Sequence, residues 1–320
     1  MRIFVTGGTG FIGSHLIDSL IEKNHEVVAL LRKSSNVQYL QGHEVELVYG
    51  DITEKNSIEL NNIDVVFHLA GILGGWNIPE KKYWDVNLDG TRNMLDACLN
   101  KNIKQFVYLS TAGVLGPNVK NADESFPYNP SNIYEKTKAE AEKLVLEYNK
   151  KHGLPVTVLR PEFVYGPRDM HVLGLFRAIK KRRFFLIDGG KSFLHLTYIS
   201  DLVRAFNGCI NGNILGTYLI AGERAVTVEE LVGTIAKELG VTLPKIYVPK
   251  NIANFIAKSS EIFSRLSGTQ PLLTCSQVRF FTEDRSFDTS LAGRELGFKP
   301  IRLEEGIRKT VEWYKQNGLL

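Results

Sequence analysis

The chain has 320 residues, of which 43% are hydrophobic, and a formal net charge of +4 at neutral pH. This length suits one large α/β domain or two closely associated ones, and so mild a charge gives no reason to expect a nucleic-acid partner. Cys98, Cys209 and Cys275 lie far apart without metal-ligand spacing, which predicts reduced thiols and no metal site. No apolar run has the length of a membrane span, and the first residues already belong to a core strand, which leaves no room for a signal peptide. We therefore expect a cytoplasmic protein.

The opening segment, M-R-I-F-V-T-G-G-T-G-F-I-G, predicts a strand, a glycine turn and the start of a helix. Residues 2–6 are β-branched and aromatic, and residues 11–23 have apolar side chains at helical spacing. Gly7 suits the tight turn, Gly10 lets the backbone approach a phosphate, and Gly13 lets the helix pack on the strand. The helix N-terminus then offers free N–H groups and a positive dipole end to a pyrophosphate. Glycine also occurs in many ordinary turns, but the strand and helix on either side favour a dinucleotide site.

Strands and helices alternate along the rest of the first half. The expected strands are 26–31, 45–49, 64–70, 105–109 and 155–160, and the expected helices are 54–60, 81–100 and 133–152. The apolar run at 65–70 is continuous, as is typical of a parallel strand covered on both faces. This order predicts an α/β protein with a Rossmann-type, doubly wound parallel sheet.

The second half is less regular. Its expected strands are 184–187, 216–220 and 245–248, and its expected helices are 200–209, 227–239, 252–266 and 303–316. We predict a dinucleotide-binding domain at 1–165 and a smaller α/β, mainly substrate-binding domain at 166–320. The two are interleaved, with some later segments returning to the Rossmann sheet. A cleft should lie between them, at the carboxyl ends of the strands.

Tyr134 and Lys138 stand one helical turn apart, and Thr111, with Ser110 beside it, follows the strand at 105–109. Beside a nicotinamide, these groups suit hydride transfer at a secondary alcohol or ketone. The tyrosine would exchange the proton, the threonine hydroxyl would hold the substrate oxygen, and the lysine charge would favour tyrosinate. Work near neutral pH would require the pKa of the tyrosine to fall by roughly three units from about 10. Alone, the Tyr-Lys spacing is also typical of a solvated helix face.

Several motifs together resemble one family. They are T-G-G-T-G-F-I-G at 6–13, G-D-I at 50–52, H-L-A-G at 68–71, V-N-L-D-G-T at 86–91, L-S-T-A-G-V-L-G at 109–116, Y-E-K-T-K at 134–138 and R-P-E-F-V-Y-G-P at 160–167. Over nearly its full length the chain is similar to the extended short-chain dehydrogenases/reductases, the NAD-dependent epimerase/dehydratase family. Its pattern is closest to 3β-hydroxysteroid dehydrogenase-like and dihydroflavonol reductase-like members.

This resemblance implies a set of site residues and a quaternary structure. The implied catalytic residues are Thr111, Tyr134 and Lys138. The implied cofactor-binding residues are Gly7, Gly10, Phe11, Ile12, Gly13, Asp51, Ile52, Leu69, Ala70, Gly71, Asn87, Tyr134, Lys138, Pro161, Phe163 and Val164. The candidate substrate contacts are Ser110, Thr111, Phe163, Arg168 and His195. The family also implies a homodimer through the helices that follow the fourth and fifth strands.

The residues after the second strand bear on the cofactor. NAD-binding folds usually place Asp or Glu there to accept a hydrogen bond from the ribose 2′-hydroxyl. This chain has Arg32 and Lys33, followed by two serines, which suits the 2′-phosphate of NADP. A basic surface loop is the plainer interpretation, and NAD is the alternative cofactor.

Departures from the family pattern bear on the reaction. Ala112 and Gly113 follow the threonine where dehydratases have acidic residues, which disfavours dehydration. Phe163 stands where many nucleotide-sugar enzymes have asparagine, and the diphosphate-binding arginine that these enzymes have just before the segment 194–198 is missing. Arg168, Arg279 or Arg285 would have to replace it.

Two surface features have more than one interpretation from the sequence. Residues 251–266 carry an apolar stripe that suits core, a dimer face, a substrate lid or peripheral contact with a membrane. The basic run at 180–183 suits either an anionic substrate or a solvated helix end.

From these observations we predict an NADP-preferring oxidoreductase that transfers hydride reversibly at a secondary alcohol or ketone of a partly apolar substrate, with Tyr134 as the acid/base. The alternatives are a nucleotide-sugar 4-epimerase or ketoreductase and, outside enzymology, a redox sensor that binds the dinucleotide.

Overall fold

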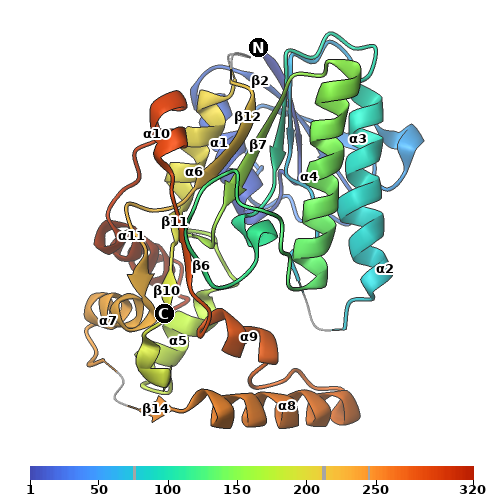
Figure 1. Ribbon diagram of the computed structural model, residues 1–320. Helices are drawn as coiled ribbons and strands as arrows, with labels where there is room; N and C mark the ends of the chain where they lie inside the picture. The colour runs from blue at the N-terminus through green and yellow to red at the C-terminus, as the bar shows by residue number, and fades with distance from the viewer. Residues whose placement is uncertain (75–76, 211–213, 244–245) are drawn as a thin grey trace.

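The computed structural model describes residues 1–74, 77–210, 214–243 and 246–320. Its centre is a sheet of seven parallel strands (Figure 1). In order across the sheet they are β12 (Gly216–Ile220), β7 (Val156–Pro161), β5 (Gln105–Leu109), β4 (Val65–His68), β1 (Arg2–Thr6), β2 (Glu26–Leu31) and β3 (Val45–Tyr49). The strand order reverses between β1 and β4, which places a ligand crevice at the carboxyl ends of these strands. The doubly wound sheet predicted from the sequence is confirmed.

Helices cover both faces of this sheet (Figure 1). On one face α1 (Phe11–Glu22) and α6 (Ile199–Gly208) pack on the strands through Leu16, Ile17 and Phe206. On the other face α3 (Gly90–Cys98) and α4 (Ile133–His152) do so through residues such as Met94 and Val145. Because both faces are buried, the strands carry continuous apolar runs.

The helix expected at 81–100 is divided into three parts. They are α2 (Glu80–Tyr83), a π-helical turn (Trp84–Asp89) and α3. Single π-turns inside helices often occur at functional sites, and this one carries Asn87. The helix expected at 54–60 is only a 3-10 turn, Lys55–Ser57.

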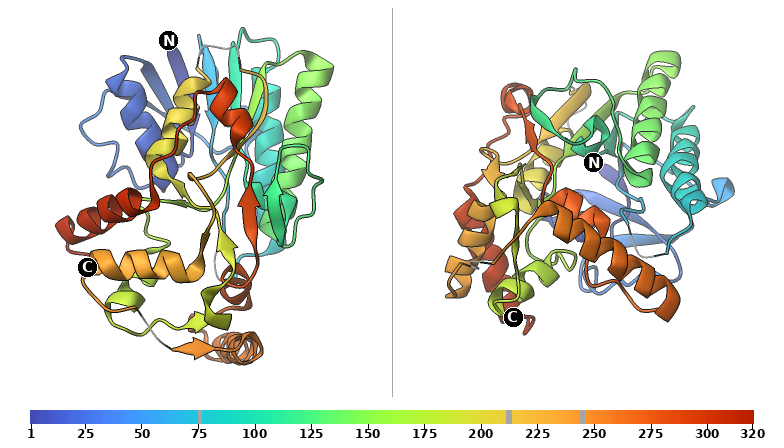
Figure 2. Two further views of the ribbon diagram at one scale, coloured as in Figure 1. Left: turned by 60° about the vertical axis from the view of Figure 1, so that its left-hand side comes forward. Right: turned by 60° about the horizontal axis from the view of Figure 1, so that its bottom comes forward.

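A second cluster of elements lies beyond the carboxyl ends of the strands (Figures 1 and 2). Its helices are α5 (Leu173–Lys180), α7 (Val228–Leu239) and α11 (Leu303–Gln316), which share one apolar core. Short strand pairs of two residues each join this cluster. β8 (Val164–Tyr165) pairs with β11 (Thr197–Tyr198), and β10 (Phe193–Leu194) pairs with β13 (Val226–Thr227). β9 (Leu186–Ile187) pairs with β14 (Tyr247–Val248), and β6 (Val119–Ala122) with β15 (Arg285–Phe287).

The remaining helices are α8 (Lys250–Ser267), α9 (Cys275–Phe280) and α10 (Ser290–Glu295). The strand expected at 216–220 is β12, at the edge of the main sheet. The strands expected at 184–187 and 245–248 are two residues each, and Lys245 itself lies outside the described residues. Within the described ranges, no helix combines the length and apolarity needed to cross a bilayer.

Candidate active site

The glycine turn between β1 and α1 leaves the helix N-terminus open. Gly7 has a φ of 73°, in the left-handed region that favours glycine. A Cβ on Gly13 would lie 2.2 Å from the carbonyl oxygen of Gly7, so helix and turn approach this closely only because Gly13 has no side chain. α1 starts after Gly10 and has no acidic residue in its first turn. Its first N–H groups are thus available to an anion.

A cleft of about 280 Å³ extends from this turn along the carboxyl ends of β1, β2 and β4. The predicted cofactor residues that line it are Gly7, Gly10, Arg32, Asp51, Ile52, Leu69, Ala70 and Gly71. The Arg32 guanidinium and the N–H groups at the glycine turn can donate hydrogen bonds to phosphates, and the cleft also has apolar walls. These features together fit a dinucleotide.

A second cavity, of about 240 Å³, continues from the cleft, since Leu69 and Gly71 line both. The predicted residues that it brings together are Phe11, Ile12, Ser110, Thr111, Tyr134, Lys138, Pro161, Phe163 and Val164. The proposed catalytic residues, which follow β5 or lie on α4, therefore meet where this cavity joins the cleft.

Burial raises the pKa of Tyr134 well above its usual value. The Thr111 side chain opposes this rise, and Glu135 and Glu162 add to it. The phenol is therefore protonated at neutral pH in the protein alone. The lowered tyrosine pKa expected from the sequence depends on the lysine charge and on a bound oxidised nicotinamide, so it stays a prediction.

Lys138 is buried at the base of the cavity. Its ammonium donates a hydrogen bond to the carbonyl of Leu109 at 2.7 Å and lies 4.1 Å from the ring centre of Tyr108. Burial lowers the pKa of Lys138 to about 7, although the Glu142 carboxylate opposes this. The side chain thus changes charge near neutral pH.

The two hydroxyls after β5 have different partners. Thr111 Oγ1 accepts a hydrogen bond from the Gly113 N–H, and the Thr111 hydroxyl faces the phenol of Tyr134, whose pKa it lowers. Ser110 donates to Glu142, which also forms a buried ion pair with Arg160 at 2.6 Å. Ser110 therefore lines the cavity, but its hydroxyl proton is bound to the Glu142 carboxylate.

Asn87 does not line either space but holds the surrounding segments together. Its Oδ1 accepts from the Ile72 N–H at 2.7 Å, and its Nδ2 donates to the Ile72 carbonyl and to Thr137 Oγ1. The π-helical turn, the segment after β4 and α4 are thereby joined behind Tyr134.

Three further predicted residues, Arg168, His195 and Lys33, also line neither space. Arg168 forms an ion pair with Asp18 at 2.8 Å and stacks on Tyr39. His195 is buried, accepts from the Phe287 N–H and donates to the Gly222 carbonyl, so it is a structural residue here. Lys33 is exposed and does not line the cleft, unlike Arg32.

The structure also brings in residues that the sequence did not single out. Asp169, His171 and Val172 line the catalytic cavity. Their only signal was their place just after the R-P-E-F-V-Y-G-P motif. Beside Tyr134, Arg285 contacts Glu135 at 3.2 Å and Glu162 at 3.8 Å in a buried charged cluster. Arg285 is therefore not a free diphosphate-binding arginine.

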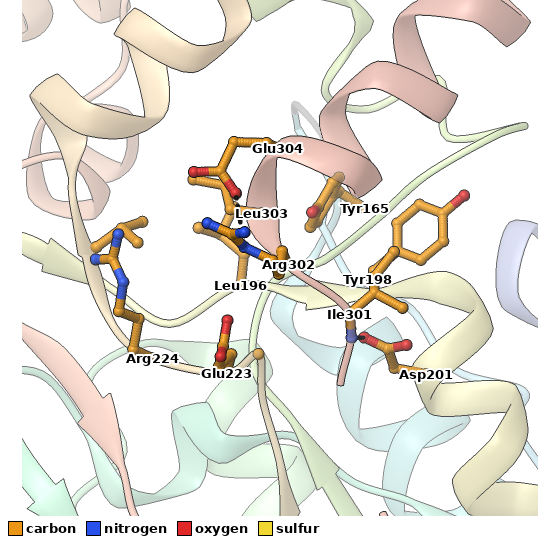
Figure 3. A pocket seen from close by; sticks show the side chains of 12 residues that line it. Tyr165, Leu196, Tyr198, Asp201, Glu223, Arg224, Ile301, Arg302, Leu303 and Glu304 are labelled. Carbon is orange, nitrogen blue, oxygen red and sulfur yellow. Dashed lines mark hydrogen bonds and ion pairs between the residues drawn. The ribbon is translucent and has the colours of Figure 1, made fainter. Parts of the chain in front are cut away.

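Another pocket lies between Tyr165, Tyr198 and the start of α11 (Figure 3). Arg302 and Glu304 form an ion pair across its rim. Its volume of about 50 Å³ admits a few water molecules. It shares no lining residue with the catalytic cavity, so we do not assign the reaction to it.

Comparisons with known proteins show the family to which the chain belongs. The profile of the NAD dependent epimerase/dehydratase family matches residues 3–211. The chain is 30% identical over 349 residues to 3beta-hydroxysteroid-dehydrogenase/decarboxylase isoform 1 of Arabidopsis thaliana, covering 96% of this chain and 78% of the relative. It is 26% identical over 335 residues to sterol demethylase protein B of Methylococcus capsulatus, covering 100% of both.

A solved structure, UDP-glucuronic acid 4-epimerase from Bacillus cereus in complex with NAD, superposes with a TM-score of 0.79. Its sequence identity is 26%, and 99% of each chain is covered. The family match covers more than half of the chain. The chain therefore belongs to the NAD dependent epimerase/dehydratase family and is an enzyme of the extended short-chain dehydrogenase/reductase type.

Proposed function

We propose that this enzyme is an NADP-preferring oxidoreductase that interconverts a secondary alcohol and its ketone on a largely apolar substrate. The observation that supports it most is that Thr111, Tyr134 and Lys138 line one cavity, which continues into the dinucleotide cleft. The cofactor would supply or accept the hydride at the carbon atom of the substrate.

In this proposal Tyr134 exchanges the proton at the substrate oxygen, and the Thr111 hydroxyl donates a hydrogen bond to the same oxygen. Because burial raises the pKa of Tyr134, its phenol is ready to protonate a developing alkoxide. The protonated phenol therefore favours ketone reduction, in which the substrate oxygen gains a proton. Lys138, whose pKa is about 7, would add positive charge below neutral pH.

The cofactor preference rests on the end of β2. Arg32 and Ser35 line the cleft there, and β2 ends on an apolar residue, Leu31. A guanidinium beside a hydroxyl suits a 2′-phosphate. Asp51 also lines the cleft, and its Oδ1 accepts hydrogen bonds from the N–H and the hydroxyl of Thr53.

The apolar substrate rests on a groove that continues from the catalytic cavity. Phe163, His171 and Val172 line both spaces, and the groove has a volume of about 570 Å³. Its further walls include the aromatic side chains Phe184, Phe185, Phe280 and Phe281. Two relatives are named for steroid or sterol reactions, which supports an apolar substrate here as well.

A groove-blocking variant tests this assignment. A Cβ on Gly174 would meet no atom within 4 Å, so Gly174→Phe should fold and place its ring in the groove. We expect the KM for a long apolar ketone to rise about tenfold and the KM for a short ketone to change little. Gly174→Ala is the matched control. An equal change for both ketones would contradict the groove assignment.

A 4-epimerase is the second candidate, favoured by the similarity to the solved UDP-glucuronic acid 4-epimerase. Such an enzyme returns the hydride to its substrate, so it would purify with tightly held NAD and show no net turnover of added cofactor. Mass spectrometry of the released nucleotide, together with an NADPH oxidation assay, separates the two. A redox sensor would bind the dinucleotide but show neither activity.

We also propose that the enzyme is a cytoplasmic homodimer formed through α3 and α4. The two helices lie side by side on one face of the sheet (Figure 1). Cys98 and Cys209 are buried free thiols, which is typical of proteins from a reducing compartment. Light scattering on the purified chain measures the oligomeric state.

A further inference from the structure

The helix α8 has its large apolar side chains on the side away from the protein. The residues that it buries are small: Ala253, Ala257 and Ser264. By contrast, Phe255 is 72% exposed and Phe263 is 66% exposed. The full set of exposed apolar residues on α8 is Ile252, Phe255, Ile256, Ile262, Phe263 and Leu266. An ordinary surface helix buries such residues and exposes polar ones.

These six residues form one continuous stripe, which we call the α8 stripe. Their spacing of three, four and seven positions places them on one side of the helix. α8 lies along the outer edge of the molecule, far from the central sheet (Figures 1 and 2). Leu272, which is 95% exposed, extends the apolar surface, since its N–H is bonded to Ser260 on α8. These residues therefore form one contiguous exposed apolar patch rather than scattered single apolar residues, and such patches mark interaction surfaces.

Basic side chains lie around this apolar surface. Lys258 and Arg265 are exposed on the polar side of α8, next to the stripe. The one acidic residue of α8, Glu261, accepts a hydrogen bond from the Cys275 N–H. The exposed basic run at 180–183 follows α5, and its Arg183 lines the apolar groove together with Leu272. The surface is therefore apolar at its centre and positive at its edge.

We propose that the α8 stripe, with Leu272, docks on an anionic phospholipid bilayer, with α8 lying in the plane of the interface. An amphipathic helix with aromatic and aliphatic residues on one face and Lys and Arg on the other is the usual device for such binding. Docking with a second copy through the same surface would bring Lys258 and Arg265 toward their own counterparts, which opposes that arrangement.

The proposed docking on a bilayer does not depend on the proposed reaction, but it would bring an apolar substrate to the enzyme. Leu272 and Leu273 line the groove that leads through Phe163 to the catalytic cavity. A bilayer against α8 would therefore lie at the outer end of this groove. An apolar substrate dissolved in the bilayer would enter without crossing water.

Vesicle co-sedimentation of the full chain tests the proposal. We expect binding to vesicles of phosphatidylcholine and phosphatidylglycerol in equal parts, and at least tenfold weaker binding to phosphatidylcholine alone. Because electrostatic attraction to anionic lipid is screened by ions, added salt should weaken the binding.

Two double variants separate the apolar and the charged contributions. Phe255→Ser with Phe263→Ser should lower the partition coefficient about tenfold or more, because two aromatic rings no longer enter the bilayer. Lys258→Gln with Arg265→Gln should lower binding to anionic vesicles by a factor of roughly five for each removed charge. Tyr49→Ser, an exposed aromatic on β3, is the matched control and should bind as the parent does. All variants change exposed side chains, so unchanged thermal unfolding verifies the fold.

Three results would overturn the proposal. The first is an absence of binding of the parent chain to anionic vesicles at low salt. The second is equal vesicle binding by the parent and the Phe255, Phe263 double variant. The third is an oligomer that dissociates in this variant while the parent ignores vesicles, since a second copy would then cover the stripe. None of these results bears on the activity with NADPH, so the reaction is tested separately.

Discussion

Around Tyr134 the local surroundings, rather than the residue types, set the protonation states. The sequence supplies a tyrosine and a lysine at the spacing of one helical turn, from which we expected a lysine charge and a lowered tyrosine pKa. In the structure burial is the largest cause for both groups, raising the pKa of Tyr134 and lowering that of Lys138 to about 7. The identity of these two residues was predictable, but their burial depends on β5, α4 and β7 meeting and is not encoded in a local motif.

Glu162 gives a pH-dependent prediction. Burial raises the pKa of its carboxyl to about 7, although Arg285 opposes this. Between about pH 4.3 and pH 7 the folded protein keeps a proton that the unfolded chain releases, so stability falls over this range and levels off once the pH has passed about 7. Glu162→Gln removes this loss. Its free energy of unfolding relative to the parent should rise by about 1–3 kcal/mol between pH 5 and pH 8.

Urea unfolding at both pH values measures this change. Glu140→Gln, on the exposed side of α4, is the control and should show no such rise. A difference between Glu162→Gln and the parent that stays constant with pH would contradict the assigned pKa.

Arg32 and Lys33 give a matched pair for the cofactor prediction. Arg32 lines the dinucleotide cleft and Lys33 does not. Arg32→Asp should therefore shift the ratio of kcat/KM for NADPH over NADH by at least about tenfold toward NADH, because a carboxylate repels a 2′-phosphate. Lys33→Asp makes the same charge change on the exposed loop and should shift the ratio less. Equal shifts would mean that only the overall charge of the loop matters.

At the scale of elements, the long periodic segments were predictable and the irregular ones were not. The glycine turn predicted β1 and α1, and α4 has the bounds 133–152 expected from the sequence, with Gly153 after it in the left-handed conformation. The π-helical turn Trp84–Asp89 was missed, because apolar periodicity gives the same signal for one long helix. That turn carries Asn87, so the sequence named the residue but not the geometry that positions it.

Gly13 is the element-scale test of the glycine turn. A methyl group there would collide with the Gly7 backbone, so Gly13→Ala must separate α1 from β1. We expect a loss of about 1–3 kcal/mol in the free energy of unfolding and weaker dinucleotide binding. Gly233→Ala on α7 is the control, because the nearest atom to its Cβ is 3.8 Å away. It should stabilise the protein by about 0.5–1 kcal/mol. Normal dinucleotide binding by Gly13→Ala would contradict the assigned role.

At the scale of the whole molecule, the site forms where the Rossmann sheet meets the later cluster of elements. This junction depends on pairings of strands only two to four residues long, such as β8 with β11 and β6 with β15, which join segments far apart in the sequence. Pairings of this length carry no periodic signal, so the sequence could not predict them. For the same reason it misplaced Arg168 and His195, whose partners come from distant segments. The apolar groove and its continuity with the catalytic cavity are likewise properties of the assembled chain.

Transfer of deuterium from NADPH deuterated at the reactive position of its nicotinamide to an apolar ketone tests the central claim most directly. Mass spectrometry of the alcohol product should find the deuterium on the carbinol carbon with the parent enzyme. With Tyr134→Phe the rate should fall at least about a hundredfold, because the group that protonates the oxygen is gone, while dinucleotide binding is retained. Tyr49→Phe, an exposed tyrosine, should behave as the parent does. Transfer by Tyr134→Phe at the parent rate, or no transfer by the parent to any apolar ketone, would contradict the account.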